Sequence, residues 1–489
     1  MNKTVPYNRR LSGSVSLAAL SVWLVILFFW LRHDPTFNFS IFAAGMDNQP
    51  AGVISGPANE QVVIGERWRL LDSSAVAPSS NWPRFRGSEF TNIVPPGPPL
   101  SNLQSASPQV RWTHQLGEGH AGAAVHNGRV YVLDYDETEK ADALRCFALE
   151  DGRELWRRSY AVQVKRNHGM SRTVPAVTDD FVITIGPRCH IMCVETVTGK
   201  FLWGLDLERE YETEVPLWYT GQCPLIDDST AVIATGGKNL LIGVDCRTGD
   251  ILWETPNPGN WQMSHSSVIP LTLHGKRQYV YCAIGGIAGI SAEEGDRGTL
   301  LWQSKIWNHT VTAPSPLEIG DNRIFLTAGY GAGGMLVQVN LNQGRFSLDS
   351  LQFVPPGSGC ASDQQTPILY NDLIWSIIPK DGGALKGQFA CFDSRDISKV
   401  IWSSGKTNRF GLGPFILADG KFYVLDDLGM MTVYDQLDTQ PVLRSQHKIL
   451  EGPDAWAPLA IVDGLLLARD SHQMVCVDIN ANQLSARLP

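Results

Sequence analysis

A short pattern returns along the chain at nearly constant spacing: a Gly, followed by an apolar stretch that ends in Trp. The four clearest copies, with their Trp residues 47, 50 and 49 positions apart, are 151–156, 198–203, 248–253 and 297–302. Fainter copies follow at 343–346, at 400–402 and around 442–443. A repeat of this length that holds several short strands is typical of β-propeller blades, because one four-stranded sheet cannot bury both faces until neighbouring sheets stack on it.

The alternation of apolar strands and turns predicts an all-β fold with eight four-stranded antiparallel blades. Inner strands are expected to start near Ala123, Val174, Cys223, Ser267, Ser315, Thr366, Pro414 and Pro458. The last blade, 457–480, shows only three strands, whereas an unassigned outer strand at 110–114 precedes the first blade. Pairing these two segments would close the ring and remove the exposed edges that a linear array leaves.

Composition agrees with short strands and excludes one class of partner. Charged residues are only 18% of the chain, which also contains 46 Gly and 29 Pro, as suits strands joined by tight turns. The net charge is −9, and no run of Lys or Arg could neutralise a row of phosphates. No nucleic acid partner is expected.

The N-terminal part carries a long apolar run. Residues 11–31 hold no charged side chain and could cross a hydrocarbon core of about 30 Å as a helix. Lys3, Arg9 and Arg10 precede the run, so the positive-inside bias places residues 1–10 in the cytoplasm. The sequence therefore predicts one transmembrane signal anchor at 11–32, with everything after it exported. The alternative is a cleaved signal peptide, although this run exceeds the usual apolar length.

Residues 33–80 read as a flexible linker between the anchor and the propeller domain at 81–489. The linker mixes Pro, Gly and Ser, and its few apolar residues follow no sustained period, so it cannot bury enough surface to offset its ordering entropy. One piece, 61–71, could pair or pack locally, and the sequence does not say against what.

Two features resemble a known family. The endings of the blades, as in 148–156 and 245–253, are similar to the tryptophan-docking pattern of the pyrroloquinoline-quinone-repeat propellers. Residues 81–87, Asn-Trp-Pro-Arg-Phe-Arg-Gly, resemble the lead-in of exported bacterial members. The resemblance covers about 81–485 and implies the eight-bladed fold. It implies no single function, since the family includes quinoprotein alcohol dehydrogenases and the cofactor-free lipoprotein of the outer-membrane barrel-assembly machinery.

With the anchor, this resemblance predicts a single-pass protein of the bacterial inner membrane whose propeller lies in the periplasm. The blade Trp residues are interpreted as structural: each ring should pack on the neighbouring blade, and its indole N–H should find a backbone acceptor.

The nine cysteines do not indicate a disulfide framework. Four of them occupy the same third-strand position in different blades and should behave as small buried hydrophobic residues: Cys146, Cys193, Cys391 and Cys476. One disulfide among the others stays open, involving Cys223, Cys246, Cys282 or Cys360. The adjacent cysteine pair that the resemblance would imply for methanol and ethanol quinoproteins is missing from the sequence. Residues 329–334 superficially resemble a dinucleotide loop but open a strand, and are interpreted as a blade hairpin.

Polar and aromatic residues gather just before each expected inner strand, where the loops ring one mouth of the central channel. The predicted ligand-binding funnel consists of His168, Arg172, Trp218, Tyr219, Gln222, His265, His309, Asp363, Gln364, Arg409 and Trp456. Such a lining would suit a sugar, a peptide end or a quinone. The alternative is that these groups only solvate the loops and satisfy the backbone. No metal site is predicted.

Two function classes remain open at this stage. The first is a binding or scaffolding propeller at the cell envelope that needs no cofactor, is held in the cytoplasmic membrane by 11–32, and presents the funnel to an envelope protein or a small ligand. The second is a quinone-dependent dehydrogenase for an alcohol or sugar, which would need pyrroloquinoline quinone with calcium and a carboxylate base. Asp363 is the candidate base in the funnel.

Overall fold

The computed structural model describes residues 20–28, 30, 62–78, 80–97, 99–100, 108–436 and 440–480. The chain divides into two compact units, 1–55 and 56–489. In the first unit, residues 20–28 and 30 are helical. No helix among the described residues is both long and apolar enough to span a bilayer. Most of the expected anchor at 11–32 lies outside the described residues.

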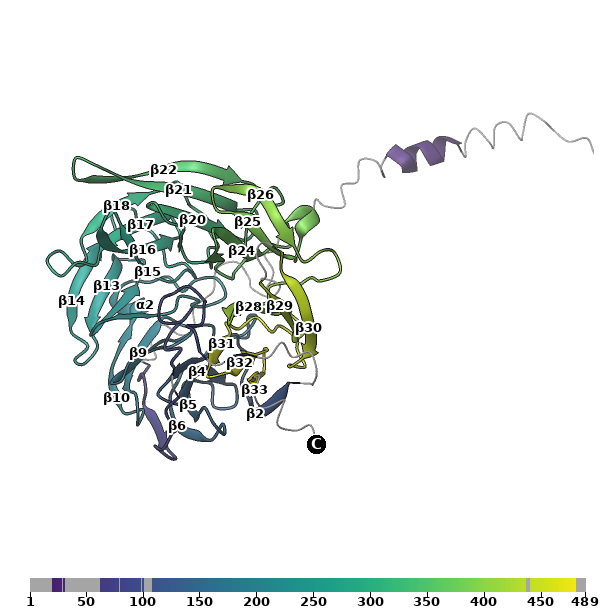
Figure 1. Cartoon of the computed structure of the whole chain (residues 1–489). Helices are drawn as coiled ribbons and strands as arrows, with labels where there is room; N and C mark the ends of the chain where they lie inside the picture. The colour runs from purple at the N-terminus through teal and green to yellow at the C-terminus, as the bar shows by residue number, and fades with distance from the viewer. Residues whose placement is uncertain are drawn as a thin grey trace, which may run out of the picture. The chain divides into compact units, whose positions relative to one another are not determined.

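The second unit is an eight-bladed all-β propeller (Figure 1). Its described strands form eight antiparallel sheets, numbered here as blades in chain order. Blade 1 contains β3 (Ala124–His126), β4 (Arg129–Asp136), β5 (Ala141–Ala148) and β6 (Glu154–Ala161). Blade 2 contains β7 (Ala176–Val177), β8 (Phe181–Ile185), β9 (His190–Glu195) and β10 (Phe201–Asp206), followed by the short helix α2 (Leu207–Glu210). Blade 3 contains β11 (Leu225–Asp227), β12 (Thr230–Ala234), β13 (Asn239–Asp245) and β14 (Ile251–Pro256).

Blades 4 to 7 repeat this order from inner to outer strand. Blade 4 contains β15 (Ile269–Leu273), β16 (Lys276–Ala283), β17 (Gly286–Ser291) and β18 (Leu300–Ser304). Blade 5 contains β19 (Leu317–Glu318), β20 (Arg323–Ala328), β21 (Gly333–Asn342) and β22 (Arg345–Val354). Blade 6 contains β23 (Ile368–Tyr370), β24 (Leu373–Ile377), β25 (Phe389–Asp393) and β26 (Asp396–Ser403), with the 3-10 turn η1 (Gly383–Leu385) between its middle strands. Blade 7 contains β27 (Phe415–Ala418), β28 (Lys421–Leu425), β29 (Met430–Asp435) and β30 (Val442–Lys448).

Blade 8 joins the two ends of the domain. Its strands β31 (Ala460–Val462), β32 (Leu465–Arg469) and β33 (Gln473–Asp478) come last in the sequence, and its outer strand β2 (Gln109–Gln115) comes before blade 1. Residues of β2 pair with β33 from Gln109↔Asp478 to Gln115↔Gln473. The predicted closure is therefore confirmed.

Blade 1 has a fifth strand that lies within the expected linker. Strand β1 (Arg67–Leu70) pairs with the outer strand β6, and Trp68 Nε1 donates a hydrogen bond to the Thr198 carbonyl of blade 2 (2.9 Å). The piece at 61–71 that the sequence left without a partner thus has one: the outer edge of blade 1.

The repeated Gly and Trp residues contact each other across blade boundaries. Gly199 of blade 2 has a φ of +69°, and a Cβ built on it would lie 2.4 Å from the Trp156 ring of blade 1. Only glycine tolerates both the left-handed backbone and this close approach. Trp203 repeats the arrangement towards blade 3, where its Nε1 donates to the Cys246 carbonyl (2.8 Å). The packing of these rings between blades is therefore as predicted. Among the four clearest copies, the expected backbone acceptor is found for Trp203 only. Within the described part of the chain, Nε1 of Trp156 and Trp253 is buried without a hydrogen bond, and Nε1 of Trp302 donates to the Gln278 side chain (2.7 Å).

All nine cysteines are free and buried. The disulfide that the sequence left open is not formed. Cys193 packs in the apolar layer between blades 2 and 3, as its third-strand position indicates.

A belt of hydrogen bonds links the residues that precede the inner strands. The Val174 N–H donates to Cys223 Sγ (3.2 Å), the Cys223 N–H to Ser267 Oγ (3.0 Å), the Ser267 N–H to Ser315 Oγ (3.2 Å), and the Ser315 N–H to Thr366 Oγ1 (2.8 Å). Each bond crosses from one blade to the next. The belt residues are the predicted starts of the inner strands, and the strands begin one or two residues later.

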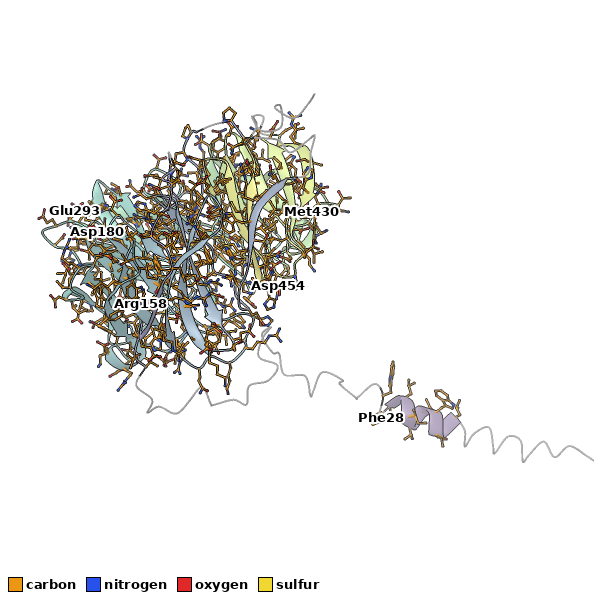
Figure 2. The ribbon with its side chains drawn as sticks, turned by 90° about the horizontal axis from the view of Figure 1, so that it is seen from below. Phe28, Arg158, Asp180, Glu293, Met430 and Asp454 are labelled. Carbon is orange, nitrogen blue, oxygen red and sulfur yellow. The ribbon has the colours of Figure 1, made fainter. Side chains whose placement is uncertain are left out.

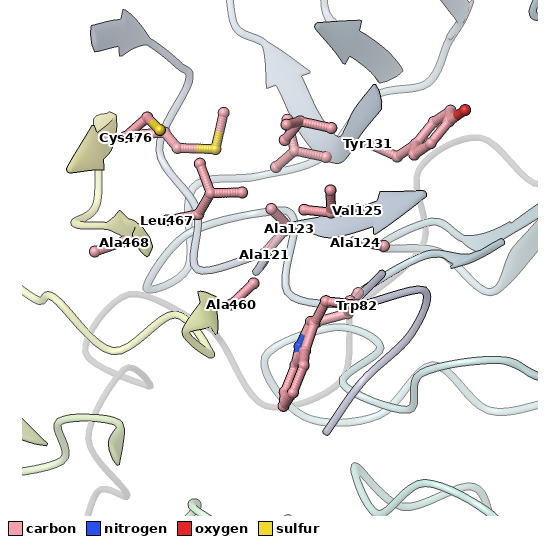
Figure 3. Close-up of a cluster of buried hydrophobic side chains, with 14 of the residues drawn as sticks. Trp82, Ala121, Ala123, Ala124, Val125, Tyr131, Ala460, Leu467, Ala468 and Cys476 are labelled. Carbon is pink, nitrogen blue, oxygen red and sulfur yellow. The ribbon is translucent and has the colours of Figure 1, made fainter. Parts of the chain in front are cut away.

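The lead-in segment runs across the axis of the ring rather than around it. Trp82 forms an isolated bridge with Val125 of blade 1 and belongs to the same buried cluster, part of which Figure 3 shows. Farther along, Ile93 bridges Leu417 of blade 7.

Between these two bridges, two arginines extend to further blades. Arg84 donates to the Ile226 carbonyl of blade 3 (2.9 Å). Arg86 donates to the carbonyls of Thr366 (2.7 Å) and Pro367 (3.0 Å) in blade 6. One short segment therefore ties blades on opposite sides of the ring.

Asp142 of β5 is a buried carboxyl with an unusual environment. The Tyr160 hydroxyl donates to its Oδ2 (2.8 Å), while Oδ1 is buried without a hydrogen bond. Burial, with the nearby Asp134 carboxylate, raises the pKa of Asp142 to about 7. The folded state therefore holds the proton of the Asp142 carboxyl more tightly than the unfolded chain does. The contribution of this proton to the free energy of unfolding is fully present below about pH 4 and is lost as the pH rises to about 7.

We expect Asp142→Asn to gain stability relative to the wild type as the pH rises. The gain should be near zero at pH 4 and roughly 4 kcal/mol at pH 8, because about three pKa units separate the two states. Urea unfolding of both proteins at several pH values measures it. A constant difference across pH would contradict the assignment.

Candidate functional site

The loops that enter the inner strands share one face of the propeller with the hairpins between second and third strands. This follows from the antiparallel order of each blade, in which the chain returns to the same end after every second strand. The face therefore combines entry loops such as 162–175 with hairpins such as 329–332. Figure 2, which draws the described side chains, labels Asp454 in the entry loop of β31.

The residues two positions before the eight predicted inner-strand starts form a ring that faces solvent, here called the axial ring. It consists of Ala121, Arg172, Gly221, His265, Ala313, Gln364, Leu412 and Trp456. All of them except Ala121 are partly exposed, whereas the residues one position later are buried except Gln365. This alternation indicates that the axial ring lines the accessible end of the propeller axis.

Large and small residues alternate around most of the axial ring, with Leu412 as the exception. The even-numbered blades contribute Arg172, His265, Gln364 and Trp456, and the odd-numbered blades contribute Ala, Gly, Ala and Leu. The small residues give the large ones room: a Cβ built on Gly221 would lie 2.9 Å from the Nδ1 of His265. Four of the predicted funnel residues thus occupy one level of the structure.

Arg172 is held entirely by carbonyl oxygens. Its Nε donates to Trp218 O (2.6 Å), and its Nη2 donates to Asn167 O (3.2 Å) and to His168 O. Within the described part of the chain it forms no ion pair. Burial lowers its pKa to about 10, so the guanidinium still carries its charge at neutral pH.

An aromatic column lies beside Arg172. Trp218 stacks on His265 on one side (centroids 6.2 Å apart) and on Tyr330 on the other (5.6 Å). The Lys380 ammonium lies 4.9 Å from the centroid of Tyr330. The Tyr219 hydroxyl donates to the Lys165 carbonyl (2.7 Å), which fixes the same loop. The column joins the loops of blades 3, 4, 5 and 6.

A second stack joins blade 8 to blade 1. Trp456 lies on His120, with ring centroids 4.4 Å apart. His120 Nε2 hydrogen-bonds to the carbonyl of His168 (3.1 Å), which also accepts from Arg172. The Gln365 amide donates to the carbonyl of Trp456 (3.1 Å) and so connects blade 6 to blade 8.

Both histidines of these stacks are neutral at neutral pH. Burial and the positive charge of Arg172 lower the pKa of His265 to about 4. Burial, Arg172 and Arg469 hold the pKa of His120 well below its ordinary value. Arg172 is therefore the permanent charge of the axial ring.

Several bulky residues of this face have a left-handed backbone. The φ angles are +52° at His168, +64° at Trp218, +71° at Tyr219, +56° at Tyr330 and +61° at Asp454. This conformation is unfavourable for aromatic residues, costs about 1–3 kcal/mol each, and tends to be found at functional sites. The strain supports a functional reading of the face.

Asp363 lies next to the aromatic column. Its Oδ2 accepts from the Lys380 N–H (3.3 Å), and its Oδ1 is buried without a hydrogen bond. Burial raises the pKa of Asp363, and the neighbouring Asp381 adds to the effect. Gln364, the next residue, donates to the Leu412 carbonyl (3.4 Å).

Three predicted funnel residues have other surroundings. Gln222 is buried and uses its amide to bond the Ala234 N–H and carbonyl of its own blade. His309 packs edge-on against Trp307 (4.3 Å). Arg409 is exposed and donates to the carbonyls of Lys386 and Lys406. Nothing among their described contacts joins them to the axial ring.

The sequence did not predict His120, Tyr330 and Lys380 as residues of the site. His120 lies in the entry loop of blade 1, three residues before Ala123, and none of the predicted funnel residues belongs to that loop. Tyr330 and Lys380 lie in second-to-third-strand hairpins. The expected strand order could have indicated Tyr330 and Lys380, because it places the hairpins between second and third strands at the same end as the entry loops.

The described residues offer no cluster of acidic side chains for the calcium that accompanies pyrroloquinoline quinone in quinoprotein dehydrogenases. Calcium requires several oxygen ligands, commonly carboxylates. Among the described residues no group of three or more His, Cys, Asp or Glu side chains could hold a metal ion. Asp363 is the only acid of the predicted funnel set.

Comparisons with known proteins agree with this architecture. The sequence profile of the family described as "Outer membrane protein assembly factor BamB" matches residues 140–404. No curated protein sequence matches the chain significantly.

Solved structures of the same fold include quinohemoprotein alcohol dehydrogenase from Comamonas testosteroni, with a TM-score of 0.54, 10% identity, and coverage of 83% of this chain and 81% of that one. A europium-containing methanol dehydrogenase gives a TM-score of 0.52 at 11% identity, with coverage of 84% and 92%. At such identity the likeness concerns the fold.

Proposed function

The chain belongs to the pyrroloquinoline-quinone-repeat propeller family, and on that premise we propose that it is a binding module of the cell envelope that works without a bound quinone. Residues 11–32 anchor it in the inner membrane of a bacterium, and its propeller extends into the periplasm. The face that carries the axial ring receives an envelope protein or a small ligand.

The axial ring carries this proposal. Arg172, His265, Gln364 and Trp456 are brought to one level by alternate blades, and Gly221 leaves room for His265. Aromatic residues with a left-handed backbone, Trp218, Tyr219 and Tyr330, lie in neighbouring loops of blades 3 and 5. Polar groups with partial exposure, held rigidly by carbonyl hydrogen bonds, are suited to recognition because little side-chain entropy is lost when a ligand binds.

A dehydrogenase is the second candidate, and one observation favours it. Asp363 combines a raised pKa with an oxygen that has no hydrogen bond, as a general base requires. Among the described residues, however, no group of acidic side chains that could hold a calcium ion accompanies Asp363.

Titration of the full-length protein with pyrroloquinoline quinone, with and without calcium, separates the two candidates. We expect no calcium-dependent rise in melting temperature and no reduction of an electron-accepting dye when alcohols or sugars are added. A calcium-dependent stabilisation together with dye reduction that disappears in Asp363→Asn would establish the enzyme and overturn the binding-module proposal. Binding of the quinone alone would count as ligand binding only, since the quinone is itself an anion.

A further inference from the structure

The inference concerns the kind of ligand and rests on the proposed function. Arg172 is a mostly buried, partly exposed cation whose described hydrogen-bond partners are all neutral carbonyls: those of Asn167, His168, Gly169 and Trp218. Carbonyl dipoles hold a guanidinium in place but leave its charge without a counter-ion. An uncompensated charge in such a place is costly, and an anion that arrives with a ligand removes that cost.

The acids of this face do not form an ion pair with Arg172 in the described part of the chain. Glu118, the acid with the largest influence on the pKa of Arg172, accepts from Arg166 and from the Gly169 N–H (2.9 Å). Asp363 accepts from the Lys380 N–H, and burial raises its pKa. Burial also raises the pKa of Asp454. None of the ion pairs in the described chain brings these carboxylates to Arg172.

The position of Arg172 makes its charge available to a ligand. It belongs to the axial ring and is partly exposed, while its Nη1 takes part in none of the bonds to carbonyls. A guanidinium presents parallel N–H groups that match the two oxygens of a carboxylate or phosphate. The partly exposed rings of His265 and Trp456 lie in the same ring and offer apolar contact to the rest of a ligand.

We infer that the axial ring binds a ligand through an anionic oxygen group, a carboxylate or a phosphate, with Arg172 as the cation that receives it. The two sources of the charge share the same chemistry at Arg172. They differ in shape, so suitable probes distinguish them.

The test uses benzoate, its neutral analogue benzamide, and inorganic phosphate as probes of the full-length protein. Saturation-transfer NMR titrations should show benzoate binding in about the millimolar range and markedly weaker binding of benzamide. Phosphate that displaces benzoate indicates a site for either anion, and phosphate that fails to displace it indicates a carboxylate site.

Two variants locate the site. Arg172→Gln should weaken benzoate at least about tenfold, because a charge-assisted hydrogen bond is lost. Arg172→Lys should restore part of the affinity. Arg158→Gln is the matched control: Arg158 also donates to carbonyls, those of Gly199 (3.0 Å) and Gly65 (2.9 Å), but it lies on the outer strand β6. It should leave the affinity unchanged.

Three results would overturn the inference, and they are distinguishable. Equal binding of benzoate and benzamide, lost in Trp456→Ala, would reject an anionic ligand while the binding-module proposal survives. If no probe binds to the wild-type protein, and its melting temperature equals that of Arg158→Gln, both the anion inference and the binding-module proposal are rejected. Unchanged benzoate affinity in Arg172→Gln would place the anion site elsewhere.

Discussion

Deleting residues 108–116 should abolish cooperative unfolding of the propeller. The deletion removes β2, which supplies the outer strand of blade 8 and buries Trp112 against blade 1. Trp112 Nε1 donates to the Leu149 carbonyl (2.8 Å), and Arg111 forms an ion pair with Asp478. Without β2, the edge of β33 is unpaired and can associate with other chains. The measurement is urea unfolding with size-exclusion chromatography, where we expect aggregation and a broad transition.

A second deletion provides the control. Removing 62–70 eliminates β1, which is also a terminal strand on an outer edge but is the fifth strand of its blade. The ring stays closed, so this variant should remain monodisperse and unfold in one transition. A milder form of the first change, Trp112→Ala, should cost about 3–5 kcal/mol, as expected for truncation of a buried Trp. If both deletions behave alike, closure through β2 is not what stabilises the ring.

Arg86→Ala should destabilise the propeller by about 3–5 kcal/mol, although the residue is far from the candidate site in sequence. The Arg86 guanidinium is buried and donates to four carbonyls: Phe90 (2.7 Å), Thr91 (3.1 Å), Thr366 (2.7 Å) and Pro367 (3.0 Å). Its loss leaves these acceptors without a donor and disconnects the lead-in from blade 6. Urea unfolding of the variant and the wild type at pH 7 measures the difference.

Arg409→Ala is the matched comparison. Arg409 also donates only to carbonyls, but it is exposed, so water replaces the lost bonds. Its cost should stay within about 0.5 kcal/mol. Equal losses in the two variants would mean that the lead-in does not depend on Arg86 to hold the blades together.

The sequence alone predicted the location of the loops in the candidate site but not the direction of each side chain. The entry loops could be located because each precedes an apolar inner strand, and this placed Arg172, His265, Gln364 and Trp456. Gln222 follows Gly221 directly, yet its amide turns to Ala234 of its own blade. Adjacent residues in an extended segment face opposite ways, and the sequence does not state which one faces the axis.

The sequence by itself determined the number of blades, the start of every inner strand to within two residues, and the strand that closes the ring. Those features follow from the regular spacing of the blade pattern along the chain. This spacing is visible in the sequence because each blade must bury the same faces against its neighbours. The tertiary structure alone decided the rest: that 82–93 ties opposite blades, that β1 extends blade 1, and that Tyr330 and Lys380 join the column on Trp218. These contacts join segments that occur once and share no repeat. Only the folded ring brings them within reach of each other.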